Sequence, residues 1–368
     1  MGDLRIVRTE GDPNARGQQI GRELRDLVSE SIDFYHRYLS RRGVSSRQLQ
    51  DLLTPYLVAA ESQFPSYMAT LKGMSVGAMV PVLELFAINA FEELEPMLES
   101  PEGGLLFLQR KEGYLAPPMP PTERCSSFAV ATREATILAH NEHWLAGDLG
   151  NVAVVIDVPD DGAVAVVSPT IVCCLPAVGI NAHGGAQGIG SLTASDDRVG
   201  VPRVLVSRHS LEAMDRADAI ERSGLPKRAG GYGHTFAFAG GDTFGVETTA
   251  ERLAILEGPP IHTNHYLHPG LAQLGPEPSE GSRARRDRLQ ELIDERRPQT
   301  VADVTDILRD HGSQPQAICL HPDPAEGDEA SAVVFSMVVE LEERRLWVAQ
   351  GNPCQNEYEE VDLAEVVR

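Results

Sequence analysis

The sequence predicts an α+β protein in which sheets and helices stack as a layered sandwich. Up to about residue 95, apolar residues recur at helical spacing. Beyond residue 125 the pattern changes to short strand-like runs, joined in pairs by turns such as PDDG and GGD. Pairs of helical stretches separate these hairpins, and this order of elements is typical of an α+β sandwich.

The N-terminal zone begins with a helix start signal. Asp12 is the expected N-cap, and Pro13 follows it at the first helical position. The apolar residues that follow lie on one face of a single long amphipathic helix: Ile20, Leu24, Leu27, Val28, Ile32 and Tyr35. A linker rich in Gly and Pro, residues 101–121, ends this zone. We therefore predict an N-terminal helical segment, 1–124, and a core, 125–368.

The core contains four predicted hairpins and three helical stretches. The strands are expected at 126–132 with 135–141, 151–158 with 163–170, 234–239 with 243–249, and 330–341 with 344–351. The helices are expected at 201–220, 282–297 and 300–312. Ser282 is the expected N-cap of the second helix, and Thr300 with Asp303 resembles a capping pair on the third.

Composition excludes several classes of function. The chain has 54 acidic and 32 basic residues, a net charge of -22, and no basic stripe that would offset repulsion from a phosphate backbone. Nucleic acid is thus excluded as a partner. The N-terminus lacks an apolar signal region, and no run of about 18 apolar residues follows, so we expect a cytoplasmic protein without a membrane partner. Five cysteines, two of them adjacent, do not form a disulfide framework.

Two polar clusters flank the first hairpin of the core. Cys125 follows the linker and opens a strand, with the small hydrogen-bonding residues Ser126 and Ser127 after it. Alone, this cysteine fits core filling, metal binding, a nucleophile or a point of self-cleavage. The motif HNEHW, residues 140–144, gathers ionisable groups behind an apolar strand, and the alternative to a functional cluster is a polar turn.

Two further clusters suggest a metal but lack a complete ligand set. In IHTNHYLHP, His262 and His265 would point to opposite faces of a strand. In HGSQPQAICLHPD, Cys319 and His321 form a Cys-x-His pair without a Cys-x-x-Cys arm. We therefore predict no metal, and a zinc-binding protein using these segments stays as an alternative.

The order of the motifs along the chain is more specific than any one of them. RCSSFA, HNEHW, GINAHGGAQGIGSL, GVPR, VETT, TNHYL, ICLH and GNPCQNEY follow a glycine-containing helical segment. This succession resembles the acyl-CoA:6-aminopenicillanic-acid acyltransferase-like family of cysteine N-terminal nucleophile hydrolases. The resemblance implies a four-layer αββα sandwich made as a precursor that cleaves itself before the cysteine.

The resemblance also implies roles for individual residues. Cys125 would attack the carbonyl carbon of Arg124, and its freed α-amine would then act as the base for its own thiol. Asn264 matches the asparagine that donates to the oxyanion, with His265 beside it as a supporting residue. Asn141 and Glu142 match positions near the amine and the pocket, where Ser126 and Ser127 also support the site.

The sequence departs from the family pattern at three positions. Arg124 stands where relatives commonly have glycine, and His143 where many have aspartate. Leu320 stands where relatives often have arginine. We interpret the paired change at His143 and Leu320 as a retuned pocket, with His143 as a pocket residue near the amine.

The expected activity is that of an amidohydrolase or acyltransferase that forms a thioester with a small-molecule amide or acyl donor. Acyl-CoA is a candidate co-substrate, no other cofactor is expected, and the resemblance suggests a role in secondary metabolism. The cleaved segments are expected to stay associated, and the sequence is compatible with either a single copy or a homo-oligomer. The alternative from another class is a catalytically silent binding protein that keeps the fold and is never cleaved.

Overall fold

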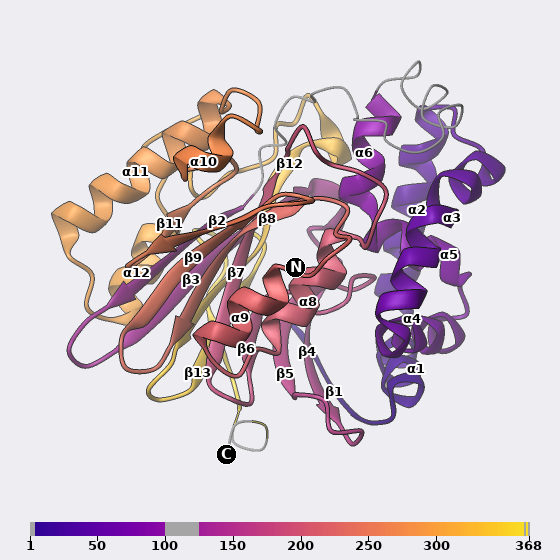
Figure 1. The fold of residues 1–368 in the computed structure, drawn as a ribbon, viewed down its shortest axis with the longest axis horizontal. Helices are drawn as coiled ribbons and strands as arrows, with labels where there is room; N and C mark the ends of the chain where they lie inside the picture. The colour runs from indigo at the N-terminus through magenta and orange to yellow at the C-terminus, as the bar shows by residue number, and fades with distance from the viewer. Residues whose placement is uncertain (1–3, 100–124, 364–365, 367–368) are drawn as a thin grey trace.

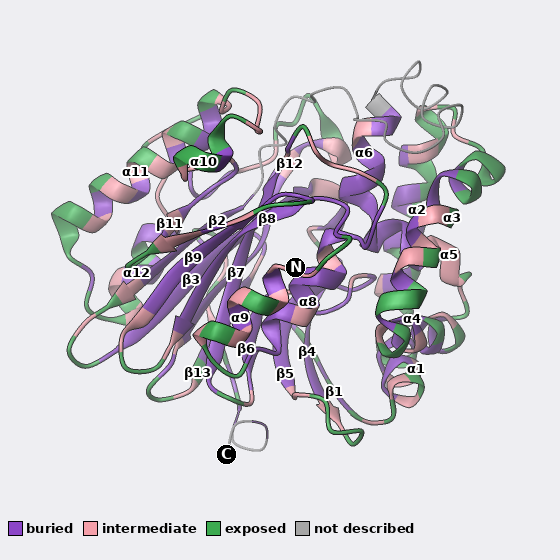
Figure 2. Cartoon of the chain, in the orientation of Figure 1, coloured by how far each residue is buried: buried purple, intermediate pink, exposed green. Residues whose placement is uncertain are grey.

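The computed structural model describes residues 4–99, 125–363 and 366. Its described part contains an eight-stranded and a six-stranded sheet, with helices outside both (Figure 1). β2 and β3 of the smaller sheet contact β7 and β8 of the larger one, so the two sheets pack face to face. The strands are buried along most of their length, as Figure 2 shows in purple.

The eight-stranded sheet has the order β1-β4-β5-β6-β7-β8-β9-β10. Its pairs are antiparallel except for the first, in which β1 (Arg5–Gly11) runs parallel to β4 (Val152–Pro159). The other strands are β5 (Val166–Ile171), β6 (Gly179–Asn181), β7 (Gly185–Leu192), β8 (Gly231–Phe238), β9 (Asp242–Thr248) and β10 (Leu253–Glu257).

The six-stranded sheet has the order β11-β2-β3-β12-β13-β14, and its pairs are all antiparallel. These strands are β11 (Ile261–His262), β2 (Ser126–Ala131), β3 (Thr136–Leu145), β12 (Ser331–Glu340), β13 (Arg345–Gln350) and β14 (Glu359–Val361). The four predicted hairpins are therefore confirmed. β3 is longer than predicted, because HNEHW continues the strand and does not form a turn.

Helices cover the outer face of each sheet. α8 (Arg203–Leu211) and α9 (Arg216–Ser223) contact the larger sheet, and α12 (Val301–Leu308) contacts β3 and β12 of the smaller one. α11 (Glu280–Arg296) packs beside α12 and β11, while α10 (Pro269–Ala272) contacts β10. The succession of helices, sheet, sheet and helices is the predicted four-layer αββα sandwich (Figure 1).

The N-terminal segment forms a helical body on one side of the sandwich (Figure 1). Its helices are α1 (Pro13–Glu23), α2 (Arg25–Arg41), α3 (Ser46–Gln63), α4 (Pro65–Ala78), α5 (Val82–Asn89) and α6 (Phe91–Glu99). The Asp12 side chain caps α1 by accepting from Ala15 N at 2.9 Å, as expected. The single long helix was wrong, because the backbone turns at fully buried Leu24 and starts a new helix there.

The segment before residue 100 is not purely helical and not separate from the core. Sequence patterns missed β1, which pairs with β4 at the edge of the larger sheet. Each β1 residue pairs with a residue 148 positions later, and a seven-residue run taken alone does not indicate so distant a partner. Buried polar contacts add to this connection. The Asp148 carboxylate accepts from Ser31 Oγ at 2.8 Å and Tyr35 Oη at 2.9 Å, and Arg203 Nε lies 2.9 Å from Glu93 Oε1.

Two predicted helix starts have different outcomes. The N-cap of α11 lies three residues before the expected one, because the Ser279 hydroxyl caps the helix by accepting from Ser282 N at 3.0 Å. The assignment of Ser282 as N-cap was therefore wrong. Thr300 and Asp303 form a capping box on α12, as predicted. In the part of the chain that the structure describes, every helix is too short or too polar to span a bilayer.

Candidate functional site

A small, mainly apolar cavity of about 50 Å³ lies where α6 meets both sheets. Its polar lining residues are Glu92 of α6, Cys125 just before β2, Glu142 of β3, Thr170 of β5, Ser191 of β7 and Tyr232 of β8. The apolar lining residues include Trp144, Ile171, Leu175, Val178, Ile189 and Phe335. The cavity therefore joins the N-terminal segment to the core and places two free thiols, those of Cys125 and Cys174, and two carboxylates at its surface.

Cys125 combines burial with an unusual backbone conformation. Its side chain is only 2 % exposed, and its thiol donates to Glu142 Oε1 at 3.0 Å. Burial, and secondly the Glu142 carboxylate, raise the pKa of this thiol well above its usual value. The φ angle of Cys125 is 43°, in the left-handed region that costs a non-glycine residue about 1 kcal/mol. Strain is thus stored at the residue that follows the Arg124 peptide, while Arg124 itself lies outside the described residues.

The alternation of β3 turns one set of HNEHW side chains toward Cys125. Glu142 Oε2 lies 2.9 Å from His140 Nε2, and His140 Nδ1 lies 2.7 Å from the Ser127 hydroxyl. Residues 140 and 142 share one face of the strand, because strand side chains alternate with a period of two. The result is a buried chain of polar groups running from the Cys125 thiol through Glu142 and His140 to Ser127.

Asn141 and His143 occupy the other face of β3. The Asn141 side-chain amide donates to the carbonyl oxygens of Leu308 at 3.0 Å and Ile318 at 2.9 Å. His143 Nε2 lies 3.1 Å from the same Ile318 oxygen and must donate to it, which leaves Nδ1 unprotonated. Burial lowers the pKa of His143 well below its usual value, so the ring is neutral.

This placement differs from the sequence interpretation of His143. Only its backbone oxygen approaches the Cys125 sulfur, at 4.0 Å, and its ring faces the loop before β12 and does not line the cavity. The retuned-pocket interpretation is therefore corrected: the His143 ring supports the back of β3. The side chain that accepts a hydrogen bond from the Cys125 thiol is that of Glu142.

Asn264 lies behind the cavity wall. Its side-chain nitrogen donates to the backbone oxygen of Ser191 at 3.3 Å, and its Oδ1 accepts from buried Arg285 at 2.7 Å. Arg285 thereby fixes which end of the amide is the donor. The neighbouring His265 ring contacts the Ser282 hydroxyl at 2.8 Å, and burial lowers the pKa of His265 to about 4.

Two functional candidates, Glu92 and His140, were not assigned a role by sequence reasoning. Glu92 accepts from Tyr232 Oη at 2.5 Å and from the Ser191 hydroxyl, and it brings a buried carboxylate from the N-terminal segment to the cavity. His140 joins Glu142 to Ser127. The presence of three acidic residues in FEELEP, in a helix otherwise rich in buried apolar side chains, was the only signal for Glu92.

Among the described residues, two groups of side chains are close enough to share a metal ion. One is Cys125 with His140 and Glu142, within the site above. The other is His311, Cys319, His321 and Cys354, on a different part of the surface. His262 and His265 belong to neither, because His262 Nε2 instead pairs with Glu247 at 3.0 Å. The zinc alternative that joined TNHYLH to ICLH thus lacks the geometry it needs.

Comparison with known proteins identifies the family. The family model for acyl-coenzyme A:6-aminopenicillanic acid acyl-transferase matches residues 130–355, and no curated protein matches the chain. Among solved structures, penicillin V acylase from Agrobacterium tumefaciens is similar with 12 % identity and a TM-score of 0.44, over 66 % of this chain and 86 % of that one. A variant of conjugated bile acid hydrolase from Clostridium perfringens is similar with 11 % identity and a TM-score of 0.35, over 66 % of this chain and 98 % of that one. Because the family model covers more than half of the sequence, the chain belongs to the acyl-coenzyme A:6-aminopenicillanic acid acyl-transferase family.

Proposed function

We propose that this protein is a cysteine amidohydrolase or acyltransferase in which Cys125, freed as an N-terminal residue, carries the acyl group as a thioester. The observation that carries the proposal is the Cys125 thiol at the cavity surface, hydrogen-bonded to the Glu142 carboxylate at 3.0 Å. A thiol becomes an effective nucleophile when a neighbouring base takes its proton. Membership of the acyltransferase family supports chemistry at an amide or acyl carbonyl.

Self-cleavage follows from the same pair. Glu142 takes the thiol proton, the Cys125 sulfur attacks the carbonyl carbon of Arg124, and the Arg124–Cys125 C–N bond breaks as the nitrogen is protonated. Water then hydrolyses the thioester, which frees the Arg124 carboxylate and regenerates the thiol. The left-handed backbone at Cys125 favours this route, because cleavage releases the strain.

The cleaved site then acts on a small molecule. The free α-amine of Cys125, with a reference pKa of about 7.7, serves as the base near neutral pH. The sulfur attacks the substrate carbonyl, the amine or thiol of the substrate leaves with a proton, and water or an acceptor amine takes the acyl group from the sulfur. A donor of the acyl-CoA class fits this scheme as a co-substrate. No other cofactor is required by these steps.

The cavity suggests which acyl groups are accepted. A volume of about 50 Å³ with mainly apolar walls has room for a few water molecules or a short aliphatic chain. Glu92 and Glu142 add negative charge beside the sulfur, which favours an amine-bearing leaving group or acceptor. We propose short-chain amides of small amines as the substrate class.

Asn264 is proposed as the oxyanion donor. Its amide group is oriented by Arg285 and lies against Ser191, which lines the cavity. Removing such a donor typically costs about 10²-fold or more in turnover. Asn264→Ala should therefore lower kcat while leaving substrate binding nearly unchanged.

The test is the mass of the denatured protein. Self-cleavage predicts two fragments, the larger of which begins at Cys125, and a Cys125→Ala variant that stays intact. The fragments should co-elute under native conditions because Glu93–Arg203 and Asp148–Tyr35 contacts are buried. An intact wild-type chain after long incubation would instead identify a silent binding protein of the same fold.

A further inference from the structure

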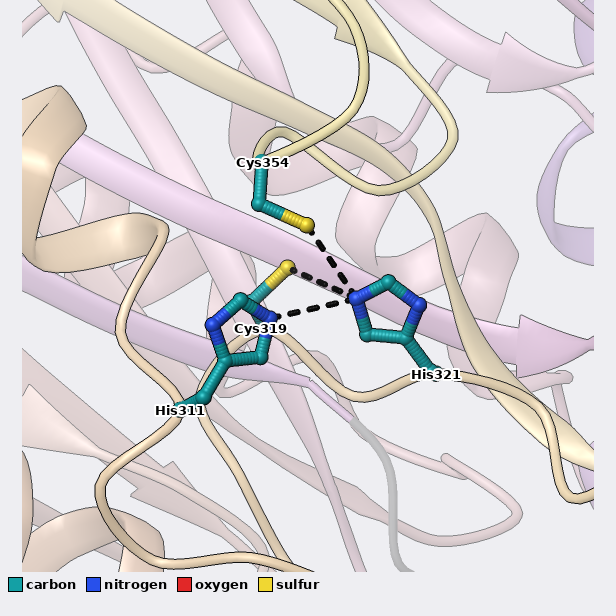
Figure 3. Close-up of side chains that lie close together, drawn as sticks. All are labelled: His311, Cys319, His321 and Cys354. Carbon is teal, nitrogen blue, oxygen red and sulfur yellow. Dashed lines mark hydrogen bonds between the residues drawn. The ribbon is translucent and has the colours of Figure 1, made fainter.

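We propose that His311, Cys319, His321 and Cys354 form a structural zinc site on the outer side of the six-stranded sheet. The four donor atoms lie within 4.8 Å of one another, and Figure 3 shows the side chains converging on one point. The residues come from separate places: His311 follows α12, Cys319 and His321 lie in the loop before β12, and Cys354 follows β13.

The distances match a tetrahedral site. His321 Nε2 lies 3.1 Å from His311 Nε2, 3.1 Å from Cys354 Sγ and 4.0 Å from Cys319 Sγ. Bond lengths of about 2.0–2.1 Å to nitrogen and about 2.3 Å to sulfur place tetrahedral ligands roughly 3.3 Å apart for two nitrogens and roughly 3.6 Å apart for nitrogen and sulfur. Small shifts of the side chains bring all four atoms to these values.

Hydrogen bonding alone does not account for the convergence. Nε2 of His321 carries either one proton or one lone pair, so it can satisfy only one of its three neighbours. A cation at the centre satisfies all of them at once. Two thiolates and two imidazoles also neutralise Zn²⁺, which suits a half-buried site, and softer sulfur ligands favour zinc over magnesium or calcium.

The surroundings support the ligands. Asn352 Nδ2 donates to Cys319 Sγ at 3.6 Å and to the carbonyl oxygen of Leu320 at 2.7 Å. Such contacts orient metal-bound thiolates and are typical of the groups around a metal centre. Exposed Cys354 gives the ion a route of entry from solvent.

The site would act on the structure and not on the substrate. Four protein ligands leave no open position for chemistry, and none of the four lines the cavity. The ion would instead fix the loop whose Ile318 oxygen accepts from Asn141 and His143. These two residues flank Glu142 on β3, so the zinc would hold the back of the catalytic strand.

Metal content of the purified full-length protein tests the proposal. We expect one zinc ion per chain after dialysis, and Co²⁺ substitution should give the visible absorption of a tetrahedral thiolate site. Cys354→Ser and His311→Gln should each lower zinc affinity by about 10²-fold or more. His36→Gln, at an exposed histidine of α2, and Cys125→Ala are matched controls that should keep the metal.

Three other outcomes would contradict the proposed zinc site. Zinc retained at full affinity by Cys354→Ser but lost by Cys125→Ala would move the metal to the Cys125, His140 and Glu142 group. A mass lower by two hydrogen atoms under non-reducing conditions, mapped to Cys319 and Cys354, would replace the ion by a disulfide. Binding of no zinc by a reduced, folded chain would also contradict the proposal.

Faster deuterium exchange of residues 311–321 on zinc removal, with residues 126–131 unchanged, would confirm the structural role.

Discussion

Glu142 lies between the Cys125 thiol and His140, and in the proposed mechanism this position gives it two opposite effects on the thiol. Its negative charge raises the pKa of the thiol, after the larger effect of burial. Its oxygen is also the acceptor for the thiol proton, and a positioned base contributes about 10²–10⁴-fold to a rate. The second effect outweighs the first, because a thiol without an acceptor stays protonated in a buried site.

Glu142→Gln separates these effects. Self-cleavage should slow by about 10²-fold or more, because the base is lost. In the uncleaved chain that accumulates, the pKa of the Cys125 thiol should fall, because a neighbouring negative charge is gone. Cleavage kinetics, and the pH dependence of Cys125 alkylation read at the peptide level, measure the two results.

Glu134→Gln is the matched control, since Glu134 is exposed at the turn before β3. This control should cleave at the wild-type rate. Wild-type cleavage by Glu142→Gln would remove Glu142 from the proposed mechanism.

At the scale of elements, α1 and α4 are held together by glycines. A Cβ built at Gly73 would overlap the backbone oxygen of Asn14, and one at Gly17 would overlap the oxygen of Thr70. The two helices therefore cross with their backbones in contact. This contact anchors α4 to α1, which in turn packs on β1 and β4 of the larger sheet.

Gly73→Ala should destabilise the protein although alanine is the better helix former. The propensity gain is about 1 kcal/mol, whereas forcing the helices apart costs about 1–3 kcal/mol. Chemical unfolding should thus give a net loss for Gly73→Ala. Gly150→Ala, where a Cβ meets open space, should be neutral, and equal effects of the two changes would argue against the close crossing.

Sequence patterns predicted individual helices and strands better than they predicted which of these elements contact one another. The hairpins were predicted because their strands alternate or run apolar between clear turn residues, and the Asp12 and Thr300 caps were predicted because they act within four residues. β1 and the faces of HNEHW were not predictable in this way, since both depend on distant partners. Cys125 and Glu142 were named from the order of motifs. By contrast, the place of Glu92 in the cavity and the proximity of His311 to Cys354 could be recognised only in the folded structure.

At the scale of the whole molecule, buried histidines make stability depend on pH. Burial lowers the pKa of His234 to about 3 and of His209 to about 4. A histidine with a lowered pKa stabilises the folded state above its unfolded pKa of about 6.5, and this contribution is lost as pH falls toward the folded value. Asp197 acts in the opposite sense, because burial raises its pKa to about 6, so its contribution is lost as pH rises through that value.

His234→Phe isolates one of these contributions. His234 stacks on Phe236 with ring centroids 5.7 Å apart, so an aromatic replacement preserves the contact. As pH falls from 7 to 4, the variant should gain about 2 to 3 kcal/mol in free energy of unfolding relative to wild type. Denaturant titrations at several pH values measure this difference. A difference that stays constant over this range would mean that His234 keeps an ordinary pKa.

The acyl-enzyme itself tests the central claim, that the Cys125 sulfur carries the acyl group. The cleaved wild-type protein is mixed with a short-chain activated ester and quenched in acid, and its intact mass is measured. Any acylation of the exposed Cys354 thiol is then recognised by peptide mapping. We predict that the larger fragment gains one acyl group, that peptide mapping places it on Cys125, and that hydroxylamine removes it as it removes a thioester. Turnover by Cys125→Ala, or an acyl group found on any other residue of an active enzyme, would contradict the account.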